Sequence, residues 1–137
     1  MLMNELKGKR VFIVEDDVTN MAIFMATLKR SGAIIIQDFW NADTTNILQK
    51  YLPVDIILLD LMLRHSISGY EIADKIKANP ALKDIPVCIV SAADPDIEIP
   101  RARQLGMSGF IGKPIDPMVF PEQVAACING EHVWYTR

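Results

Sequence analysis

Five short apolar runs alternate with five longer stretches of helical spacing along the 137 residues, and this alternation constrains the fold more than any other feature. The short runs are rich in β-branched residues and continuously apolar, which suits strands buried on both faces of a parallel sheet. The longer stretches repeat apolar residues three or four positions apart, which suits helices that cover such a sheet. Strict alternation therefore predicts one α/β domain, with five parallel strands, five helices on the two faces and right-handed crossovers.

The boundaries of these elements follow from their apolar runs and from the residues that interrupt them. The expected strands are 11–14, 33–36, 54–59, 87–90 and 110–111. Four of the expected helices are 18–30, about 44–51, about 70–78 and about 117–128. The remaining helix follows Asp94 and Pro95, and because Pro100 interrupts its pattern we expect it to be short, irregular or late in starting. The tail from His132 to Arg137 either packs back on the domain or remains free.

The bulk properties favour a cytoplasmic protein with one principal domain. We expect that domain over 9–128, after an N-terminal extension of residues 1–8 and before a C-terminal tail of 129–137. The net charge of −3, from 14 basic and 17 acidic residues, is too small to indicate non-specific binding to nucleic acid or membranes. No apolar run approaches the roughly 20 residues that span a bilayer, and Cys88 and Cys127 lack the spacing of a metal site or a disulfide framework.

Charged and hydroxyl side chains follow four of the five expected strands. Glu15 and Asp16 follow the first strand, Asp60 the third, Ser91 the fourth and Lys113 the fifth. Ligands of open parallel sheets bind beyond the carboxyl ends of the strands, where the strand order reverses. In the order 2-1-3-4-5 the first and third strands are neighbours, so we expect the three carboxylates to lie within a few ångströms of one another.

Such a cluster of acids indicates a cation and a phosphoryl site. The three carboxylates repel one another unless they are protonated or neutralised, and oxygen ligands favour a hard ion, Mg²⁺ or Mn²⁺. Asp60 is then expected to attack phosphorus in line and become an acyl phosphate. We expect Asp16 to be a direct metal ligand, Glu15 to act directly or through water, and Met62 to contribute its backbone carbonyl. Lys113 is expected to pair with the phosphoryl group.

Four motifs at the strand ends resemble those of one signalling family. They are Val14-Glu15-Asp16-Asp17, Leu58-Leu59-Asp60-Leu61-Met62, Val90-Ser91-Ala92 and Lys113-Pro114-Ile115-Asp116. In this order they are similar to the receiver domain of two-component response regulators. The resemblance implies a flavodoxin-like fold and a stand-alone receiver that accepts a phosphoryl group on Asp60 from a histidine kinase or phosphotransfer protein.

The resemblance also implies a switch and an output surface. Ser91 matches the family's hydroxyl residue, which moves toward the phosphoryl group and donates a hydrogen bond to it, and Phe110 matches the aromatic that turns inward behind it. The bond between Lys113 and Pro114 is implied to be cis. Output is expected toward a downstream protein, not toward nucleic acid or membrane, through a face formed by the fourth helix, fifth strand and fifth helix, which also allows a homodimer.

The loop after Asp60 departs from the family pattern. Arg64 stands where the family usually has proline, and the loop glycine, Gly69, arrives about one residue late. We expect these changes to affect the choice of partner and the lifetime of the phosphoryl group more than the chemistry.

Two other functions are weighed against a phosphorylation switch. A pseudo-receiver would act as an interaction module that is never phosphorylated, and the intact acidic set argues against it. An aspartyl-phosphate phosphohydrolase would carry a second aspartate as general acid where this chain has Met62. We therefore expect no turnover of a separate substrate.

Overall fold

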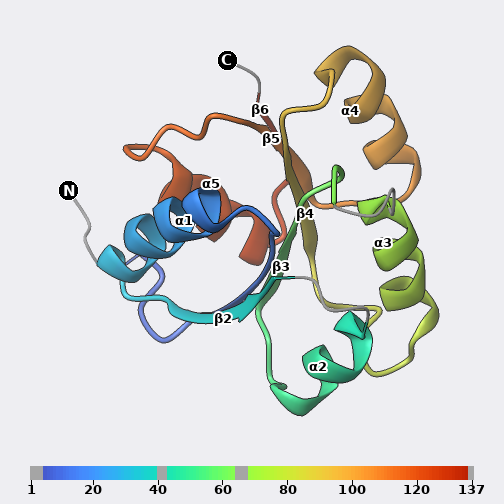
Figure 1. Cartoon of the computed structure of the whole chain (residues 1–137), viewed down its shortest axis with the longest axis horizontal. Coiled ribbons are helices and arrows are strands. Elements are labelled where there is room, and N and C mark those ends of the chain that lie inside the picture. The colour runs from blue at the N-terminus through green and yellow to red at the C-terminus, as the bar shows by residue number, and fades with distance from the viewer. Residues whose placement is uncertain (1–4, 40–42, 64–67, 136–137) are drawn as a thin grey trace.

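The computed structural model describes residues 5–39, 43–63 and 68–135, which form a twisted sheet between two layers of helices (Figure 1). The strands are β1 Arg10–Val14, β2 Ile34–Asp38, β3 Ile56–Leu59, β4 Val87–Ser91, β5 Gly109–Gly112 and β6 Val133–Tyr135. They pair in parallel in the order β2-β1-β3-β4-β5-β6. The expected α/β fold and the order of the first five strands are confirmed.

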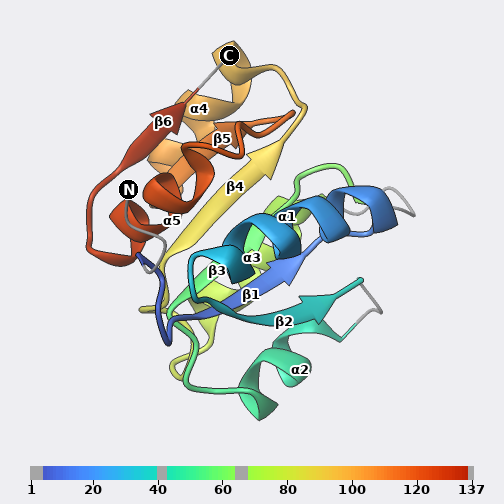
Figure 2. The same ribbon diagram turned by 90° about the vertical axis from the view of Figure 1, so that its left-hand side faces the viewer.

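The sixth strand corrects the expected count of five. β6 runs alongside β5 (Figure 2), with Gly109 opposite Val133 and Phe110 opposite Trp134. A valine and two aromatic residues suit a strand, and their pairing covers an edge of the sheet that β5 would otherwise expose. Of the two possibilities left open for the tail, its described part packs back on the domain.

Five helices cover the two faces of the sheet: α1 Val18–Arg30, α2 Thr44–Lys50, α3 Gly69–Ala78, α4 Pro95–Gln104 and α5 Phe120–Ile128. Helices α1 and α5 lie on one face, and α2, α3 and α4 on the other (Figure 1). Side chains alternate along each strand, so β1 sends Val11 and Ile13 into the core under α1 and α5, and Phe12 and Val14 into the opposite core.

The fourth helix is neither short nor late in starting, and of the three expected possibilities only an irregularity at Pro100 remains. Pro95 occupies its first turn, where a missing N–H costs nothing, and the Asp94 side chain caps that turn by accepting a hydrogen bond of 3.0 Å from the Asp96 N–H. The helix continues through Pro100 to Gln104.

The fifth helix starts at Phe120, three residues later than predicted. Asp116 closes a turn ahead of it, because its side chain accepts a hydrogen bond of 2.9 Å from the Met118 N–H and its carbonyl accepts one of 2.9 Å from the Phe120 N–H. The later start places Pro121 in the first turn of the helix, where it removes no helical hydrogen bond.

Candidate functional site

The ends of β1 and β3 bring three carboxylates together. The two strands pair in parallel with Val14 opposite Leu59, so the residues that follow them emerge side by side at one edge of the sheet. Carboxylate oxygens of Glu15, Asp16 and Asp60 all lie within 4.8 Å of one another. This is the juxtaposition expected from the strand order, and a single cation between these oxygens could be held by all three residues.

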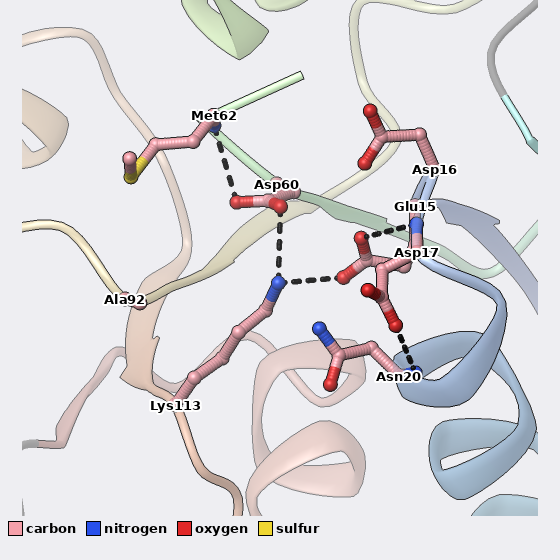
Figure 3. Close-up of a pocket in the computed structure, with 8 residues that line it drawn as sticks. All are labelled: Glu15, Asp16, Asp17, Asn20, Asp60, Met62, Ala92 and Lys113. Atoms are coloured by element: carbon pink, nitrogen blue, oxygen red, sulfur yellow. Dashed lines mark hydrogen bonds and ion pairs between the residues drawn. The ribbon is translucent and has the colours of Figure 1, made fainter. Parts of the chain in front are cut away.

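Lys113 reaches the cluster from the end of β5. Its Nζ atom lies 2.6 Å from Glu15 Oε1 and 3.0 Å from Asp60 Oδ2 (Figure 3). Its backbone N–H donates to the Ser91 carbonyl at 2.9 Å, which ties the start of its loop to β4. The peptide bond that follows, between Lys113 and Pro114, is cis, as the resemblance implies.

Burial and charge act in opposite directions on this ion pair. Burial raises the pKa of Glu15, although the hydrogen bonds from Lys113 and from the Asp17 N–H favour its ionised form. Burial alone would lower the pKa of Lys113, but its hydrogen bond to Glu15 and the charge of Asp60 outweigh that effect, and the pKa is raised. Lys113 is therefore a cation at neutral pH, with a side chain only 13% exposed.

Asp60 is fixed by contacts on both carboxylate oxygens. Oδ2 accepts the hydrogen bond from Lys113, and Oδ1 accepts one of 3.2 Å from the Met62 N–H. Its backbone N–H donates to the Val14 carbonyl at 3.2 Å, so the residue continues the pairing of β3 with β1. Only 6% of Asp60 is exposed, and the residue lines a pocket.

That pocket has a volume of about 280 Å³ and lies over the acidic cluster (Figure 3). It is lined by Glu15, Asp16, Asp17, Asn20, Asp60, Met62, Ala92 and Lys113. Asn20 was not among the residues singled out from the sequence. The signal that could have identified it is its position in the first turn of the helix that follows Glu15 and Asp16, because that turn begins at the same edge of the sheet.

Two of the predicted site residues are buried and do not line the pocket. Ser91 is fully buried at the end of β4, and its hydroxyl oxygen accepts a hydrogen bond of 3.1 Å from the Ala93 N–H. Ala92, not Ser91, lines the pocket. Phe110 is fully buried in the core beside β4 and β6. Their switching roles stay predictions, as does the metal-binding role of the Met62 carbonyl.

The loop after Asp60 is described only in part, because Arg64 lies outside the described residues. Gly69, at the end of this loop, packs against the backbone of Asp60. A Cβ atom on Gly69 would lie 2.1 Å from the Asp60 carbonyl oxygen. Its N–H donates to the Leu61 carbonyl at 3.0 Å. Gly69 therefore fixes the path of the chain on either side of Asp60.

A known protein family matches this sequence over most of its length. The sequence pattern of the response regulator receiver domain matches residues 11–125. This chain belongs to the response regulator receiver domain family. Receiver domains act as phosphoryl-accepting signalling modules and bind Mg²⁺ at an acidic cluster.

Relatives of this receiver include a single-domain regulator. This chain is 33% identical over 121 residues to that regulator, the polar-differentiation response regulator DivK of Brucella ovis. The aligned residues cover 88% of this chain and 97% of DivK. The fold of this chain is also that of the signal receiver domain of a signal transduction histidine kinase from Syntrophus aciditrophicus (TM-score 0.77, 24% identity, 90% and 92% of the two chains). The chemotaxis protein CheY4 of Vibrio cholerae is similar too (TM-score 0.76, 17% identity, 85% and 95%).

The helices of this receiver are short. In the described part of the chain, none combines the length and the apolar character that crossing a membrane requires.

Proposed function

We propose that this receiver is a phosphorylation switch, in which Asp60 takes a phosphoryl group from a histidine kinase or phosphotransfer protein and thereby changes which proteins the chain binds. The observation that carries the proposal is the joint placement of Asp60 beside Glu15 and Asp16, with oxygens within 4.8 Å, and beside Lys113, with Nζ at 3.0 Å. Such a set provides a nucleophile, ligands for a cation and a fixed positive charge around one point. The cytoplasmic location expected from the sequence is part of this proposal.

The reaction requires Asp60 to form one bond while the donor loses another. A carboxylate oxygen of Asp60 attacks phosphorus, and the bond from phosphorus to the donor's imidazole nitrogen breaks in line, leaving its electron pair on that nitrogen. Lys113 already contacts Asp60 Oδ2, so its ammonium group can move to an incoming phosphoryl oxygen over a short distance. Ser91 would complete the contacts by donating a hydrogen bond from its hydroxyl to a phosphoryl oxygen once it turns toward the pocket.

The acidic cluster fits the expected Mg²⁺. Asp16, Asp60 and Glu15 would hold the ion through their carboxylates, and Met62 through its backbone carbonyl. When bound, the ion supplies positive charge that neutralises the phosphoryl oxygens in the transition state. Without it, Lys113 is the cation placed between two of the acids.

The proposed output surface differs in one respect from the expected one. The strand of the expected face, β5, is paired on both sides, with β4 and β6. Trp134 of β6 lies under the guanidinium group of Arg103 from α4, at 4.8 Å from the ring centroid. We therefore propose that any partner or second copy approaching between α4 and α5 contacts β6 as well.

Intact-mass measurement after incubation with acetyl phosphate and Mg²⁺ tests this function. The wild type should gain the mass of one phosphoryl group, and Asp60→Asn should gain none. Asp74→Asn, which alters an exposed acid on α3, is the matched control and should behave as the wild type. An unmodified wild type would favour the interaction module that is never phosphorylated, and sustained release of phosphate from generic phosphate esters would favour a phosphohydrolase.

A further inference from the structure

We propose that Asn20 contacts the phosphoryl group directly, with its side-chain amide donating a hydrogen bond to a phosphoryl oxygen on Asp60. This inference rests on the proposed function and adds a residue to it. Asn20 lines the same pocket as Asp60 and Lys113, and its amide group points into that pocket in Figure 3. Because the amide can donate two hydrogen bonds and carries no charge, it can meet an anion without competing with Lys113 for the acids.

The start of α1 holds Asn20 in this position. Asn20 is the third residue of the helix, and its backbone N–H donates to the side chain of the capping residue Asp17 at 2.8 Å. Asp16, which precedes the cap, lines the same pocket as Asn20. The next residue, Met21, is buried in the core and fixes the rotation of the helix about its axis.

The side-chain amide of Asn20 is available for a ligand. Within residues 5–39, 43–63 and 68–135, the only hydrogen bond found for Asn20 outside the helical ladder is that of its backbone N–H to Asp17. The residue is partly buried, so the amide is held near the pocket and is not fully solvated. A half-buried polar group without a protein partner gains from a charged acceptor more than an exposed one does.

The phosphoryl group needs such a donor. It presents three oxygens, of which Lys113 and the cation can each meet one. Ser91 is the donor expected for the third, but it is fully buried and does not line the pocket, whereas its neighbour Ala92 does. Asn20 is the neutral side-chain donor that already lines the pocket, so it can engage the phosphoryl group before any movement of Ser91.

Beryllofluoride, which mimics the phosphoryl group, provides the test. Calorimetry with the full chain and saturating Mg²⁺ should show that Asn20→Ala weakens beryllofluoride binding about tenfold, as expected for one lost hydrogen bond to a charged group. Its affinity for Mg²⁺ alone should stay within about twofold of the wild type, because the amide serves the anion and not the cation. Asn20→Asp should weaken beryllofluoride binding further, since it adds a carboxylate to a site that must accept an anion.

The control is Asn46→Ala, which removes the asparagine at the third position of α2, away from the pocket, and should leave both affinities unchanged. Equal beryllofluoride affinity in Asn20→Ala and the wild type would overturn the inference while leaving the proposed function intact. An equal loss of Mg²⁺ affinity in Asn20→Ala would also overturn it, because Asn20 would then act through the metal site. A wild type that binds no beryllofluoride would overturn both proposals.

Discussion

Lys113 and Gly69 show how single residues define this site. The ammonium group of Lys113 lies between two buried acids, 2.6 Å from one and 3.0 Å from the other, and supplies the charge that lets them remain close. Gly69 acts by having no side chain, because it allows α3 to begin directly against the backbone of Asp60. One residue sets the electrostatics of the pocket and the other sets its shape.

Replacing Gly69 by alanine should destabilise the fold. The new Cβ atom would lie 2.1 Å from the Asp60 carbonyl oxygen and 3.0 Å from Leu61 Cα, both on the backbone, so the loop would have to move. We expect a loss of about 3 kcal/mol in the free energy of unfolding, the upper end of overpacking costs, measured by urea denaturation.

The control for this prediction is Gly106→Ala. Gly106 has a positive φ of 76°, but no atom lies within 4 Å of the position its Cβ would take. Its replacement should cost about 1 kcal/mol, from backbone strain alone. Equal costs at the two positions would show that the close approach to Asp60 does not matter.

The residues that form the site were largely predictable, and Asn20 shows the limit. The ends of β1 and β3 could be located from their apolar runs, and the parallel pairing of the two strands then dictates that Glu15, Asp16 and Asp60 meet. The role of a helix residue depends on the rotation of the helix, which the packing of Met21 decides. The hydroxyl of Ser91 is engaged by the Ala93 N–H and does not line the pocket, which the motif alone does not reveal.

At the scale of elements, the ends of the first five strands and of α1, α2 and α3 lie within two residues of their expected positions, and the start of α5 is the larger departure. Apolar runs and helical spacing locate most of these ends, but the start of α5 depends on the turn that Asp116 closes in competition with a helix. The strand β6 escaped prediction because its three residues gain their stability from pairing with β5, which is tertiary context and not local preference.

Helix α4 lacks one backbone hydrogen bond at Pro100, and a substitution there can restore it. This proline is exposed and lies inside the helix, where it has no N–H to donate to the carbonyl four residues earlier. Pro100→Ala should raise the free energy of unfolding by about 1–2 kcal/mol, since the restored hydrogen bond exceeds the added entropy of the unfolded chain. Pro95→Ala is the control and should bring no gain, because Pro95 occupies the first turn. A loss of stability in Pro100→Ala would contradict this explanation.

The strand β6 should contribute measurably to stability through Trp134. This side chain is partly buried against the core and lies beneath Arg103. Trp134→Ala should lower the free energy of unfolding by about 2 kcal/mol, less than the loss at a fully buried site. Met118→Ala, at a side chain 67% exposed, should change it by less than about 0.5 kcal/mol. Equal values for the two variants would mean that β6 does not stay paired in solution.

At the scale of the whole molecule, the acidic cluster exists only when the fold is complete. Its members come from the ends of two strands, and the lysine that opposes them comes from a third, so residues 15, 60 and 113 meet through the sheet. The unfolded chain offers no comparable set of ligands. Binding of a cation should therefore be linked to the stability of the entire domain.

Mg²⁺ should stabilise the folded protein through this linkage. At roughly 100 times its dissociation constant, it should add about 2.7 kcal/mol to the free energy of unfolding, measured by urea denaturation against NaCl of equal ionic strength. Asp16→Asn should lose most of that gain, and Asp74→Asn should keep it. Equal gains in Asp16→Asn and the wild type would place the binding of Mg²⁺ elsewhere.

The most direct test is to locate the phosphoryl group chemically. Borohydride reduces an acyl phosphate on aspartate to homoserine, so treatment of the acetyl-phosphate-modified protein followed by peptide mass mapping identifies the acceptor. The placement of Asp60 beside the other acids and Lys113 predicts homoserine at position 60 alone. Reduction at Glu15 or Asp16, or no reduced residue at all, would contradict the assignment of Asp60 as phosphoacceptor.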